Sequence, residues 1–232
     1  MKYRRELKYL LSEYTATLLR VRVSAVMKPD SHSNGIYIVN NLYLDDRFDT
    51  FYYQKYLGQV NRDKYRFRYY NNDLSFIVLE RKHKDGILSY KEKIPVTIEQ
   101  FMKIKAGDID WIHEEDAPLW RKLSVVHRLR SLRPTAYYAY KREAYVYEPG
   151  NIRFTFDSPI YDPGNGSSNL GYDPLSSTYS KVEYFPLLLE VKYSGFVPEI
   201  IKRMLNGFPL SHVAVSKYCI ARERGFLPYG KV

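Results

Sequence analysis

The sequence has little of several features that would place it in a familiar class. It contains one cysteine, Cys219, in 232 residues, which excludes an internal disulfide and a cysteine-based zinc site. No stretch approaches the roughly 18 uninterrupted apolar residues of a membrane-spanning helix. The first residues, Met1-Lys2-Tyr3-Arg4-Arg5-Glu6, are charged and lack the apolar segment of a signal peptide. These absences predict a cytoplasmic protein without a transmembrane segment.

Recognisable catalytic motifs are also absent. The five histidines show no metal-ligand spacing, and no Ser-His-Asp or Cys-His arrangement stands out. The segment Gly225-Phe226-Leu227-Pro228-Tyr229-Gly230-Lys231 imitates the start of a P-loop, but Val232 stands where Ser or Thr is required. A P-loop nucleotide site is therefore not expected.

The sequence is rich in positive charge and in tyrosine. It has 36 Lys and Arg against 26 Asp and Glu, a formal net charge of +10, and 24 tyrosines. Hydrophobic residues make up 45% of the chain, enough for a packed core and too many for a disordered basic tail. A basic globular domain attracts anions. Composition leaves open nucleic acid, an anionic membrane surface and a phosphorylated small molecule.

Predicted strands outnumber predicted helices. Alternating, aromatic-rich and β-branched segments predict strands at Tyr3–Tyr9, Gly35–Leu44, Lys64–Tyr70, Phe76–Lys82, Leu88–Pro95, Ala136–Tyr147, Ile152–Asp157, Val182–Tyr184 and Leu187–Lys192. Helical spacing and caps predict helices at Leu10–Ser24, Asp46–Gln59, Thr97–Gly107, Pro118–Arg130, Val197–Asn206 and Ser216–Arg224. A turn-rich stretch, Ser158–Ser180, predicts a long surface loop. The pattern favours one α+β domain over residues 1–232, with a mainly antiparallel sheet.

Charged residues repeat on one face of many strands. Alternate residues of a strand share a face, so Glu6 joins Lys8, Arg66 joins Arg68 and Glu190 joins Lys192. Glu80 with Lys82, Lys91 with Lys93, and Arg153 with Asp157 follow the same pattern, and Arg142 lies among tyrosines. Such faces can simply meet water. If the sheet curls into a β-barrel with the helices packed outside, they line a lumen that requires a polyanion, because unpaired like charges repel strongly there.

Several short motifs, in this order, resemble one family. They are Arg4-Arg5-Glu6-Leu7-Lys8-Tyr9, Leu42-Tyr43-Leu44-Asp45 followed by Phe51-Tyr52-Tyr53, Arg66-x-Arg68, Leu79-Glu80-Arg81-Lys82, Leu189-Glu190-Val191-Lys192 and Ser216-Lys217-Tyr218. Together they resemble the VTC domain, the polyphosphate polymerase domain of the vacuolar transporter chaperone complex. That domain is related to the CYTH domains and is a triphosphate tunnel metalloenzyme. The resemblance runs from about Tyr3 to Arg222.

The resemblance implies a reaction and a set of site residues. The γ-phosphate of ATP would pass to a growing polyphosphate chain in a basic tunnel, with Mn²⁺ or Mg²⁺ bound. The implied catalytic residues are Lys8, Arg66, Arg68, Lys82 and Glu190. The implied substrate-binding residues are Lys91, Lys93, Arg142, Arg153, Lys192 and Lys217. Glu190 would hold the metal, and Glu6 would assist it. Such a reaction requires mainly the positioning and neutralisation of phosphate oxygens.

The match to the family has one departure and one ambiguity. The family often has a second basic residue three positions before the one matched to Lys217, and here that position is Ala214. Either phosphate binding is weaker at this position, or His212 takes the place of the missing basic residue. The spacing after Lys82 does not decide between Lys91 and Lys93 as the phosphate contact. We expect Tyr43 to support the lumen from outside.

Three other functions fit some of the same features. A CYTH-type triphosphatase or cyclase would use more inward-facing glutamates. A non-catalytic domain that binds polyphosphate or inositol phosphate would tolerate Ala214. A nucleic-acid-binding protein would place its cations on an outer surface with exposed aromatics, so nucleic acid is not expected as a partner. ATP and inorganic polyphosphate are the expected partners, and a membrane would be reached only through another protein.

Overall fold

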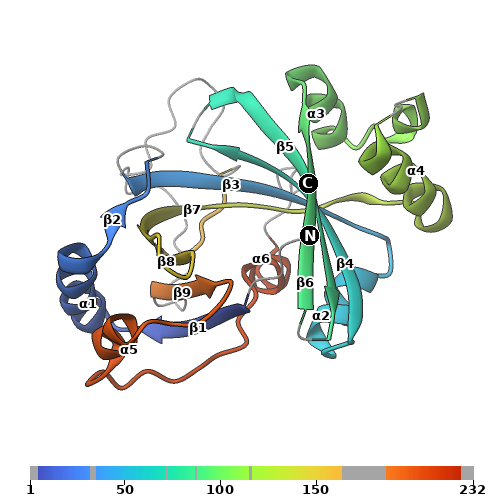
Figure 1. Ribbon diagram of the computed structural model, residues 1–232. Helices are drawn as coiled ribbons and strands as arrows, with labels where there is room; N and C mark the ends of the chain where they lie inside the picture. The colour runs from blue at the N-terminus through green and yellow to red at the C-terminus, as the bar shows by residue number, and fades with distance from the viewer. Residues whose placement is uncertain are drawn as a thin grey trace. The chain divides into compact units, whose positions relative to one another are not determined.

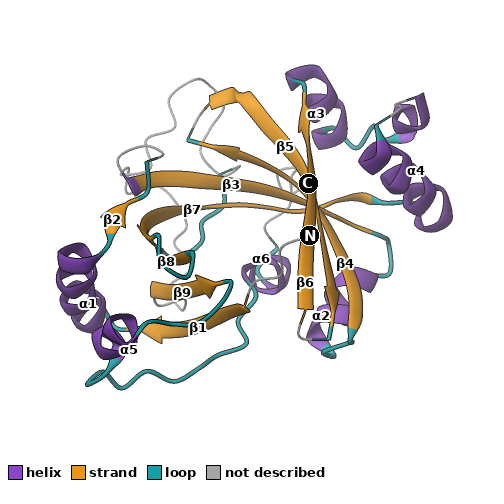
Figure 2. Cartoon of the chain, viewed as in Figure 1, coloured by secondary structure: helices purple, strands orange, loops and turns teal. Residues whose placement is uncertain are grey.

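The computed structural model describes residues 5–31, 35–71, 73–86, 88–114, 117–163 and 187–225 (Figures 1 and 2). Its strands are β1 (Arg5–Leu11), β2 (Lys28–Pro29), β3 (Ile36–Asp45), β4 (Asn61–Tyr70), β5 (Asp73–Asp85), β6 (Leu88–Val96), β7 (Arg133–Tyr147), β8 (Ile152–Asp157) and β9 (Leu187–Tyr193). Its helices are α1 (Glu13–Val26), α2 (Thr50–Tyr56), α3 (Ile98–Lys105), the 3₁₀ helix η2 (Asp110–Glu114), α4 (Pro118–Arg130), α5 (Glu199–Leu205) and α6 (Lys217–Glu223).

The described strands belong to one sheet. Their order is β1-β9-β8-β7-β3-β4-β5-β6, and β2 pairs with β7. The strand pairs whose register is resolved are antiparallel. The predicted strand at Val182–Tyr184, most of the predicted loop Ser158–Ser180 and the P-loop-like segment after Gly225 lie outside the described residues.

The chain divides into two compact units, each built from three segments. The first unit comprises residues 1–38, 140–160 and 181–215, and the second comprises residues 39–139, 161–180 and 216–232. Both β3 and β7 contribute residues to both units.

The core of the first unit lies between helix α1 and the apolar faces of β7, β8 and β9. Leu19 and Val23 of α1 are fully buried, and they cluster with Phe154, Phe156 and Leu189 of the strands. The alternating sequence of β8 and β9 places these apolar side chains on one face, because successive residues of a strand point in opposite directions. The charged residues between them lie on the other face.

The core of the second unit is larger and richer in aromatic residues. Tyr65 and Phe67 of β4 are buried on the same face as Leu79 of β5, and they pack with Phe101 of α3 and Trp120 of α4. This apolar packing explains part of the tyrosine surplus, since tyrosine suits a pleated surface that is buried on one side. Helices α3 and α4 therefore cover the face of β4 and β5 opposite their basic residues.

The predicted boundaries of α1 and α2 were wrong. Leu10 and Leu11 belong to β1, where they lie opposite Leu188 and Leu187 of β9, and helix α1 starts only after its cap, Ser12, whose hydroxyl accepts from the backbone N–H of Thr15 at 3.1 Å. Apolar cross-strand pairing thus overrode the helical spacing of the leucines. Helix α2 is shorter than predicted.

Helix α2 begins at Thr50 and not at Asp46, and this later start has a local cause. Asp45 and Asp46 precede the helix, and their carboxylates accept hydrogen bonds from the backbone N–H groups of Phe51 (2.9 Å), Tyr52 (2.9 Å) and Thr50 (3.0 Å). These groups have no intrahelical acceptor at a helix start. By contrast, the helix predicted from Thr97 begins there as expected, because Thr97 caps it in a full capping box with Gln100.

Candidate functional site

Basic side chains of the second unit form ordered rows across three strands. Register places Lys64 of β4 opposite Lys82 of β5, and Lys82 opposite Lys91 of β6. The next row along joins Arg66, Glu80 and Lys93 in the same way. Directly opposite residues share a face of the sheet, so we name this surface of β4, β5 and β6 the phosphate face, after the ligand that we propose for it. The structure thus brings together five of the residues that sequence reasoning proposed, namely Arg66, Arg68, Lys82, Lys91 and Lys93.

Glu80 holds several of these cations in place. Its carboxylate is buried and accepts from Nε of Arg66 at 2.7 Å and from Nζ of Lys91 at 3.2 Å, with Nη1 of Arg68 at 3.9 Å. Burial alone would raise the pKa of Glu80, but Arg66, Arg68 and Lys91 outweigh it and hold this pKa well below its ordinary value. Glu80 is therefore a charged anchor that orients the cations.

Sequence reasoning did not assign Glu80 a role in the site. The available signal was its position in the alternating pattern, on the same face as Lys82. What the sequence lacked was the register that sets Glu80 opposite Arg66. The attraction between a buried carboxylate and its arginines outweighs the cost of desolvation only when the geometry of the ion pairs is good.

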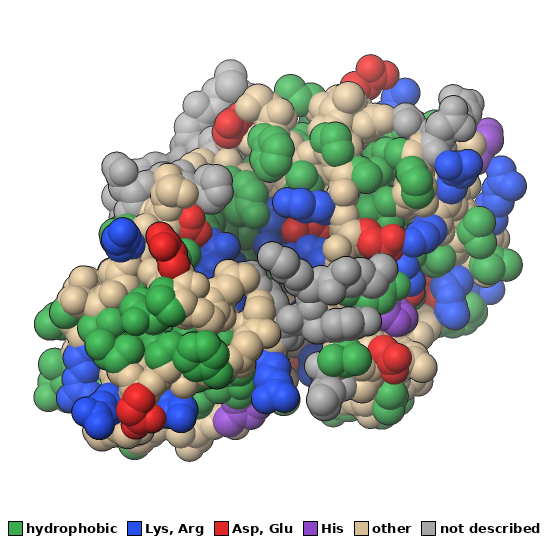
Figure 3. All heavy atoms as spheres, viewed as in Figure 1, with side chains coloured by type: hydrophobic (Ala, Val, Ile, Leu, Met, Phe, Trp, Pro, Cys, Tyr) green, Lys and Arg blue, Asp and Glu red, His purple; other side chains and the backbone are tan. Residues whose placement is uncertain are grey.

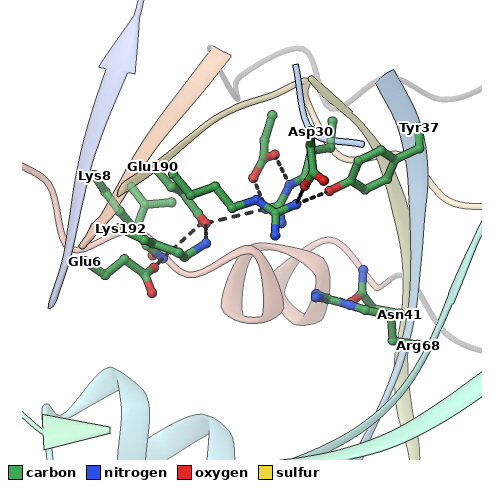
Figure 4. A network of polar contacts seen from close by, with 12 residues as sticks. Glu6, Lys8, Asp30, Tyr37, Asn41, Arg68, Glu190 and Lys192 are labelled. Carbon is green, nitrogen blue, oxygen red and sulfur yellow. Dashed lines mark hydrogen bonds and ion pairs between the residues drawn. The ribbon is translucent and has the colours of Figure 1, made fainter. Parts of the chain in front are cut away.

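Two polar residues of β3 also support the arginines. The amide oxygen of Asn41 accepts from Nε and Nη2 of Arg68 at 2.9 and 2.8 Å, as Figure 4 shows for this pair. The hydroxyl of Tyr43 accepts from Nη1 of Arg66 at 2.8 Å. The expectation that Tyr43 supports the site from outside was wrong, because register with β4 places it opposite Arg66, on the phosphate face.

The start of helix α6 lies beside this face. Nζ of Lys64 is 4.6 Å from the ring centre of Tyr218 and donates to the hydroxyl of Ser216 at 3.4 Å. The ring of Tyr218 in turn stacks on Tyr43, with 4.6 Å between the centroids. Lys217 lies between Ser216 and Tyr218 and is buried. The second unit therefore also brings the predicted Lys217 to the neighbourhood of Lys64, a lysine that was not among the predicted site residues.

Two groups on this face have a pKa of about 8. Burial lowers the pKa of Lys64 to about 8, although the Tyr43 phenol opposes the shift. Burial would raise the pKa of Tyr43, but Arg66, Lys64 and Arg68 together lower it to about 8. Above pH 8, Lys64 therefore loses a positive charge and Tyr43 gains a negative one.

These two pKa values predict pH-dependent binding of an anion. Affinity for tripolyphosphate is expected to fall about 10-fold between pH 7 and pH 9, because the site loses positive charge over this range. Titration calorimetry at several pH values measures this slope. In Lys64→Arg the side chain stays charged, so the slope should be roughly half as steep.

The matched control for this pH series is Lys103→Arg, a change of the same type at an exposed site on α3. It should show the same slope as the unchanged protein. An affinity that is flat from pH 7 to pH 9 would contradict the assigned role of Lys64.

The first unit carries a different charge pattern. Register places Glu6 of β1 opposite Lys192 of β9, and Lys8 opposite Glu190. On the neighbouring strands, Asp157 lies opposite Arg142. Positive and negative side chains therefore alternate across this face, whereas the described residues on the phosphate face of β4, β5 and β6 have Glu80 as their carboxylate. Among the described residues, carboxylates are thus interleaved with Lys and Arg on the charged face of the first unit, whereas Lys and Arg dominate the phosphate face of the second.

Glu190 is the centre of the network in the first unit. Its buried carboxylate contacts Lys8 Nζ at 3.6 Å, Lys192 Nζ at 2.5 Å and Arg142 Nη2 at 3.5 Å. Figure 4 shows Lys8 and Lys192 converging on it, with Glu6 beside Lys8, and the Nζ–Oε1 distance from Lys8 to Glu6 is 3.1 Å.

The two lysines respond to Glu190 differently. Burial lowers the pKa of Lys8, but Glu190 and Glu6 outweigh it and raise that pKa above its ordinary value. For Lys192, burial outweighs the attraction of Glu190, so its pKa is lowered. Lys8 is thus firmly charged, whereas Lys192 gives up its proton more readily.

The two arginines of the first unit are held by aspartates. Arg142 makes a bidentate pair with Asp157, with distances of 2.6 and 2.7 Å. Nη2 of Arg153 lies 2.5 Å from the carboxylate of Asp30 and donates to the hydroxyl of Tyr37 at 2.7 Å. Paired arginines of this kind are positioned, and their charge is largely offset by the aspartates.

The first unit offers oxygen donors of the kind that a hard cation prefers. No group of three His, Cys, Asp or Glu side chains suited to a metal ion lies among the described residues. Mg²⁺, however, commonly binds through one or two carboxylates together with phosphate oxygens of the substrate. The carboxylates of Glu190 and Glu6 both contact Nζ of Lys8. Thr155, opposite Glu190 on β8, has a buried hydroxyl oxygen without a hydrogen-bond partner. These residues fit a metal that is shared with a substrate.

The proposed substitute for a basic residue at Ala214 does not hold. His212 lies beside Tyr9 in a short bridge, and their rings meet edge to face with 6.1 Å between the centroids. Tyr9 and Lys8 are consecutive residues of β1 and so point to opposite faces. His212 therefore lies on the face opposite Lys8.

A sequence profile of the VTC domain matches residues 3–226. The chain belongs to the VTC domain family. The resemblance seen in the motif order is thereby confirmed over nearly the whole chain, while the extent of a single domain over residues 1–232 stays a prediction. No curated protein matches the chain.

Several solved structures share the fold of this VTC domain chain at low sequence identity. The putative adenylyl cyclase from Hippeastrum, described as having a dominant triphosphatase activity, has a TM-score of 0.59 at 16% identity, covering 98% of each chain. A putative adenylate cyclase from Bacillus halodurans has a TM-score of 0.51 at 14% identity, covering 92% of this chain and 95% of its own. The α+β fold of the triphosphate tunnel type, with a mainly antiparallel sheet, is confirmed.

No helix among the described residues of the VTC domain chain has the length and apolar character needed to cross a membrane. Family and fold together place the chain among triphosphate tunnel proteins, a group that includes a triphosphatase.

Proposed function

We propose that this VTC domain chain is a cytoplasmic phosphotransferase that adds the γ-phosphate of ATP to a polyphosphate chain. The observation that carries the proposal is the phosphate face. Lys64, Arg66, Lys82, Lys91 and Lys93 are aligned on three neighbouring strands around one buried carboxylate, Glu80. Rows of cations at strand spacing suit an anion whose charges repeat along its length, as in a linear phosphate chain.

The proposed roles follow the chemistry of each side chain. Arg66 and Arg68 present guanidinium forks that match phosphate oxygens in pairs. Lys8 and Lys82 supply compact charges that neutralise the transferred group. The remaining proposed contacts with substrate phosphates are Lys91, Lys93, Arg142, Arg153, Lys192 and Lys217.

In the proposed reaction, a terminal oxygen of the polyphosphate acceptor attacks the γ-phosphorus of ATP. The bond from this phosphorus to the bridging oxygen of the β-phosphate breaks, and ADP leaves with that oxygen. Phosphoryl transfer of this type requires positioning and charge neutralisation, and no covalent intermediate on the protein. The acceptor is itself a phosphate, so no side-chain nucleophile is required.

Mn²⁺ or Mg²⁺ would be held by Glu190 and Glu6, with the Thr155 hydroxyl nearby. Bound there, it would supply charge neutralisation for phosphate oxygens. Lys8 and Lys192, which now contact Glu190, would then be free to turn toward the substrate. Arg142 stays oriented by its bidentate pair with Asp157.

The direct test is to incubate the purified protein with ATP, Mn²⁺ and a short polyphosphate primer. A phosphate polymer that lengthens on a gel, together with stoichiometric ADP, is the expected result. ADP with free phosphate and no polymer would show a triphosphatase instead. Tight binding of polyphosphate without turnover would show a binding domain and contradict the proposed reaction.

A triphosphatase is the second candidate, because one observation favours it. The charged face of the first unit carries three carboxylates, Glu6, Glu190 and Asp157. The Hippeastrum neighbour of similar fold is described as a triphosphatase. Water would then replace the phosphate acceptor, and the same gel assay separates the two reactions.

A further inference from the structure

Helix α4 of the second unit has two apolar faces, and the core accounts for only one of them. Leu119, Trp120 and Leu123 are buried in the core of the unit. Val125 and Leu129 lie on the outer side of the helix, where they are 57% and 78% exposed. The outer side of a surface helix normally carries polar residues, so the second apolar strip indicates a contact surface.

Two arginines lie beside this apolar strip. Arg121 and Arg128 are four and three residues from Val125, the spacing at which residues share a helix face. Both arginines are exposed, and among the described residues neither has an ion-pair partner. We call the surface formed by Arg121, Val125, Arg128 and Leu129 the outer face of α4.

The other lysine and arginine of α4 already have carboxylate partners. Lys122 contacts Glu92 of β6, and Arg130 contacts Asp46 at 3.4 Å. The sequence of α4, PLWRKLSVVHRLR, contains no Asp or Glu. The unpaired charge of the outer face is therefore positive and comes from the two arginines beside the apolar strip. Figure 3 shows Lys and Arg side chains interspersed with hydrophobic ones where α4 lies in Figure 1.

A second exposed apolar group in this unit has different charges around it. Tyr56 and Leu57, at the end of α2, are exposed to a similar extent. The ring of Tyr56 stacks on Tyr52, whose hydroxyl donates to Glu223 at 3.0 Å. A carboxylate thus lies beside this group, and it lacks the purely cationic border of the outer face of α4.

We propose that the outer face of α4 docks on a lipid bilayer that contains anionic lipids. Val125 and Leu129 enter the boundary between head groups and acyl chains, and the two arginines reach the lipid phosphates. The apolar side chains project from a convex helix surface, which suits a deformable bilayer, whereas an acidic protein would have to offer a matching groove. This contact is direct, unlike the contact through another protein that the sequence suggested.

The docking surface is separate from the phosphate face, because its residues belong to α4 and not to β4, β5 or β6. Two contributions act together in it. Burial of the apolar strip and attraction to anionic head groups each give weak binding alone, and stable association requires both. Neutral vesicles and soluble head groups are therefore expected to bind much more weakly than an anionic bilayer.

The test is flotation of the full chain with vesicles of phosphatidylcholine, alone or mixed with about one-third phosphatidylserine. Binding to the mixed vesicles alone is expected, and soluble glycerophosphoserine should not compete. Arg128→Gln should weaken binding about 5-fold, the contribution of one arginine near an anionic surface. Leu129→Gln should weaken it about 10-fold, because a partly buried leucine is lost.

The matched controls are Arg47→Gln and Leu57→Gln, which make the same changes at exposed positions beside α2 in the same unit. Both should bind the mixed vesicles as tightly as the unchanged protein. Arg66→Ala should also keep vesicle binding, since lipid phosphates do not occupy the phosphate face. The altered residues of α4 lie on the surface, so the variants should fold, and thermal melts check this.

Four results would overturn the proposal. The first is no binding to the mixed vesicles, and the second is equal binding to both vesicle types. The third is equal losses in the α4 variants and their matched controls, and the fourth is a loss in Arg66→Ala as large as in Arg128→Gln. Binding of poly-glutamate without binding of vesicles would likewise contradict a bilayer and indicate an acidic protein partner.

Discussion

Arg66→Ala is expected to weaken the binding of tripolyphosphate about 100-fold. Arg66 occupies the central row of the phosphate face and is fixed from two sides, by Glu80 at 2.7 Å and by the Tyr43 hydroxyl at 2.8 Å. A hydrogen bond to a charged group contributes about 1.5–3 kcal/mol, and each 1.4 kcal/mol is about tenfold in affinity. Titration calorimetry in metal-free buffer measures the loss.

Arg66→Lys separates charge from geometry. Lysine keeps the positive charge but loses the planar fork that pairs with two phosphate oxygens, so a loss of about tenfold is expected. If alanine and lysine at position 66 weaken binding equally, the fork is what matters and the charge contributes little.

The matched control for Arg66 is Arg128→Ala, which removes one charge from an exposed position of α4 in the same unit. It lowers the net charge equally and should leave affinity almost unchanged, because exposed charges far from a ligand are screened by salt. Equal losses in Arg66→Ala and Arg128→Ala would contradict the phosphate face. Thermal melts of both variants detect any unfolding caused by leaving Glu80 with fewer partners.

Glu190→Gln is expected to reduce turnover of ATP about 1000-fold and to leave metal-free phosphate binding intact. The variant removes the central carboxylate of the first unit, which is the proposed metal ligand. Neutralisation of phosphate charge by a bound metal contributes several kcal/mol, of which about 4 kcal/mol corresponds to this loss. Lys8 and Lys192 lose their anionic partner, so affinity for tripolyphosphate without metal should stay the same or rise.

Two measurements separate this role from a structural one. Turnover is followed as ADP release at increasing Mn²⁺, and binding by calorimetry without metal. Glu143→Gln is the matched control, since Glu143 of β7 pairs with Arg20 at 2.7 Å on the face opposite Arg142. It should keep full turnover. A Glu190→Gln protein as active as the control would refute the metal assignment.

The individual faces of the strands could be predicted because they depend on local geometry. In β4, the alternation of Arg66 and Arg68 with Tyr65 and Phe67 is a property of consecutive residues. The structure buries the aromatic set in the core and sets the arginines on the phosphate face. The capping box at Thr97 is local in the same sense. Membership of the VTC domain family likewise followed from the order of short motifs.

The sequence could not determine which charges neutralise one another. Lys8 and Glu190 are far apart in the chain, yet they are direct neighbours because β1 pairs with β9 in one register. A shift of one residue would carry Glu190 to the other face. Glu80 became the anchor of Arg66 for the same reason, and Tyr43 joined the phosphate face through its register with β4.

The two units differ in how their charged side chains are paired, and this difference separates what the sequence determines from what the tertiary structure decides. The amino-acid sequence by itself determined that charged and apolar residues alternate along the strands, since that periodicity is set by the backbone of each strand. Only the tertiary structure decided that cations gather around Glu80 in the second unit and alternate with carboxylates around Glu190 in the first. Strand register is the physical reason, because it brings together side chains whose separation in the sequence carries no record of their contact.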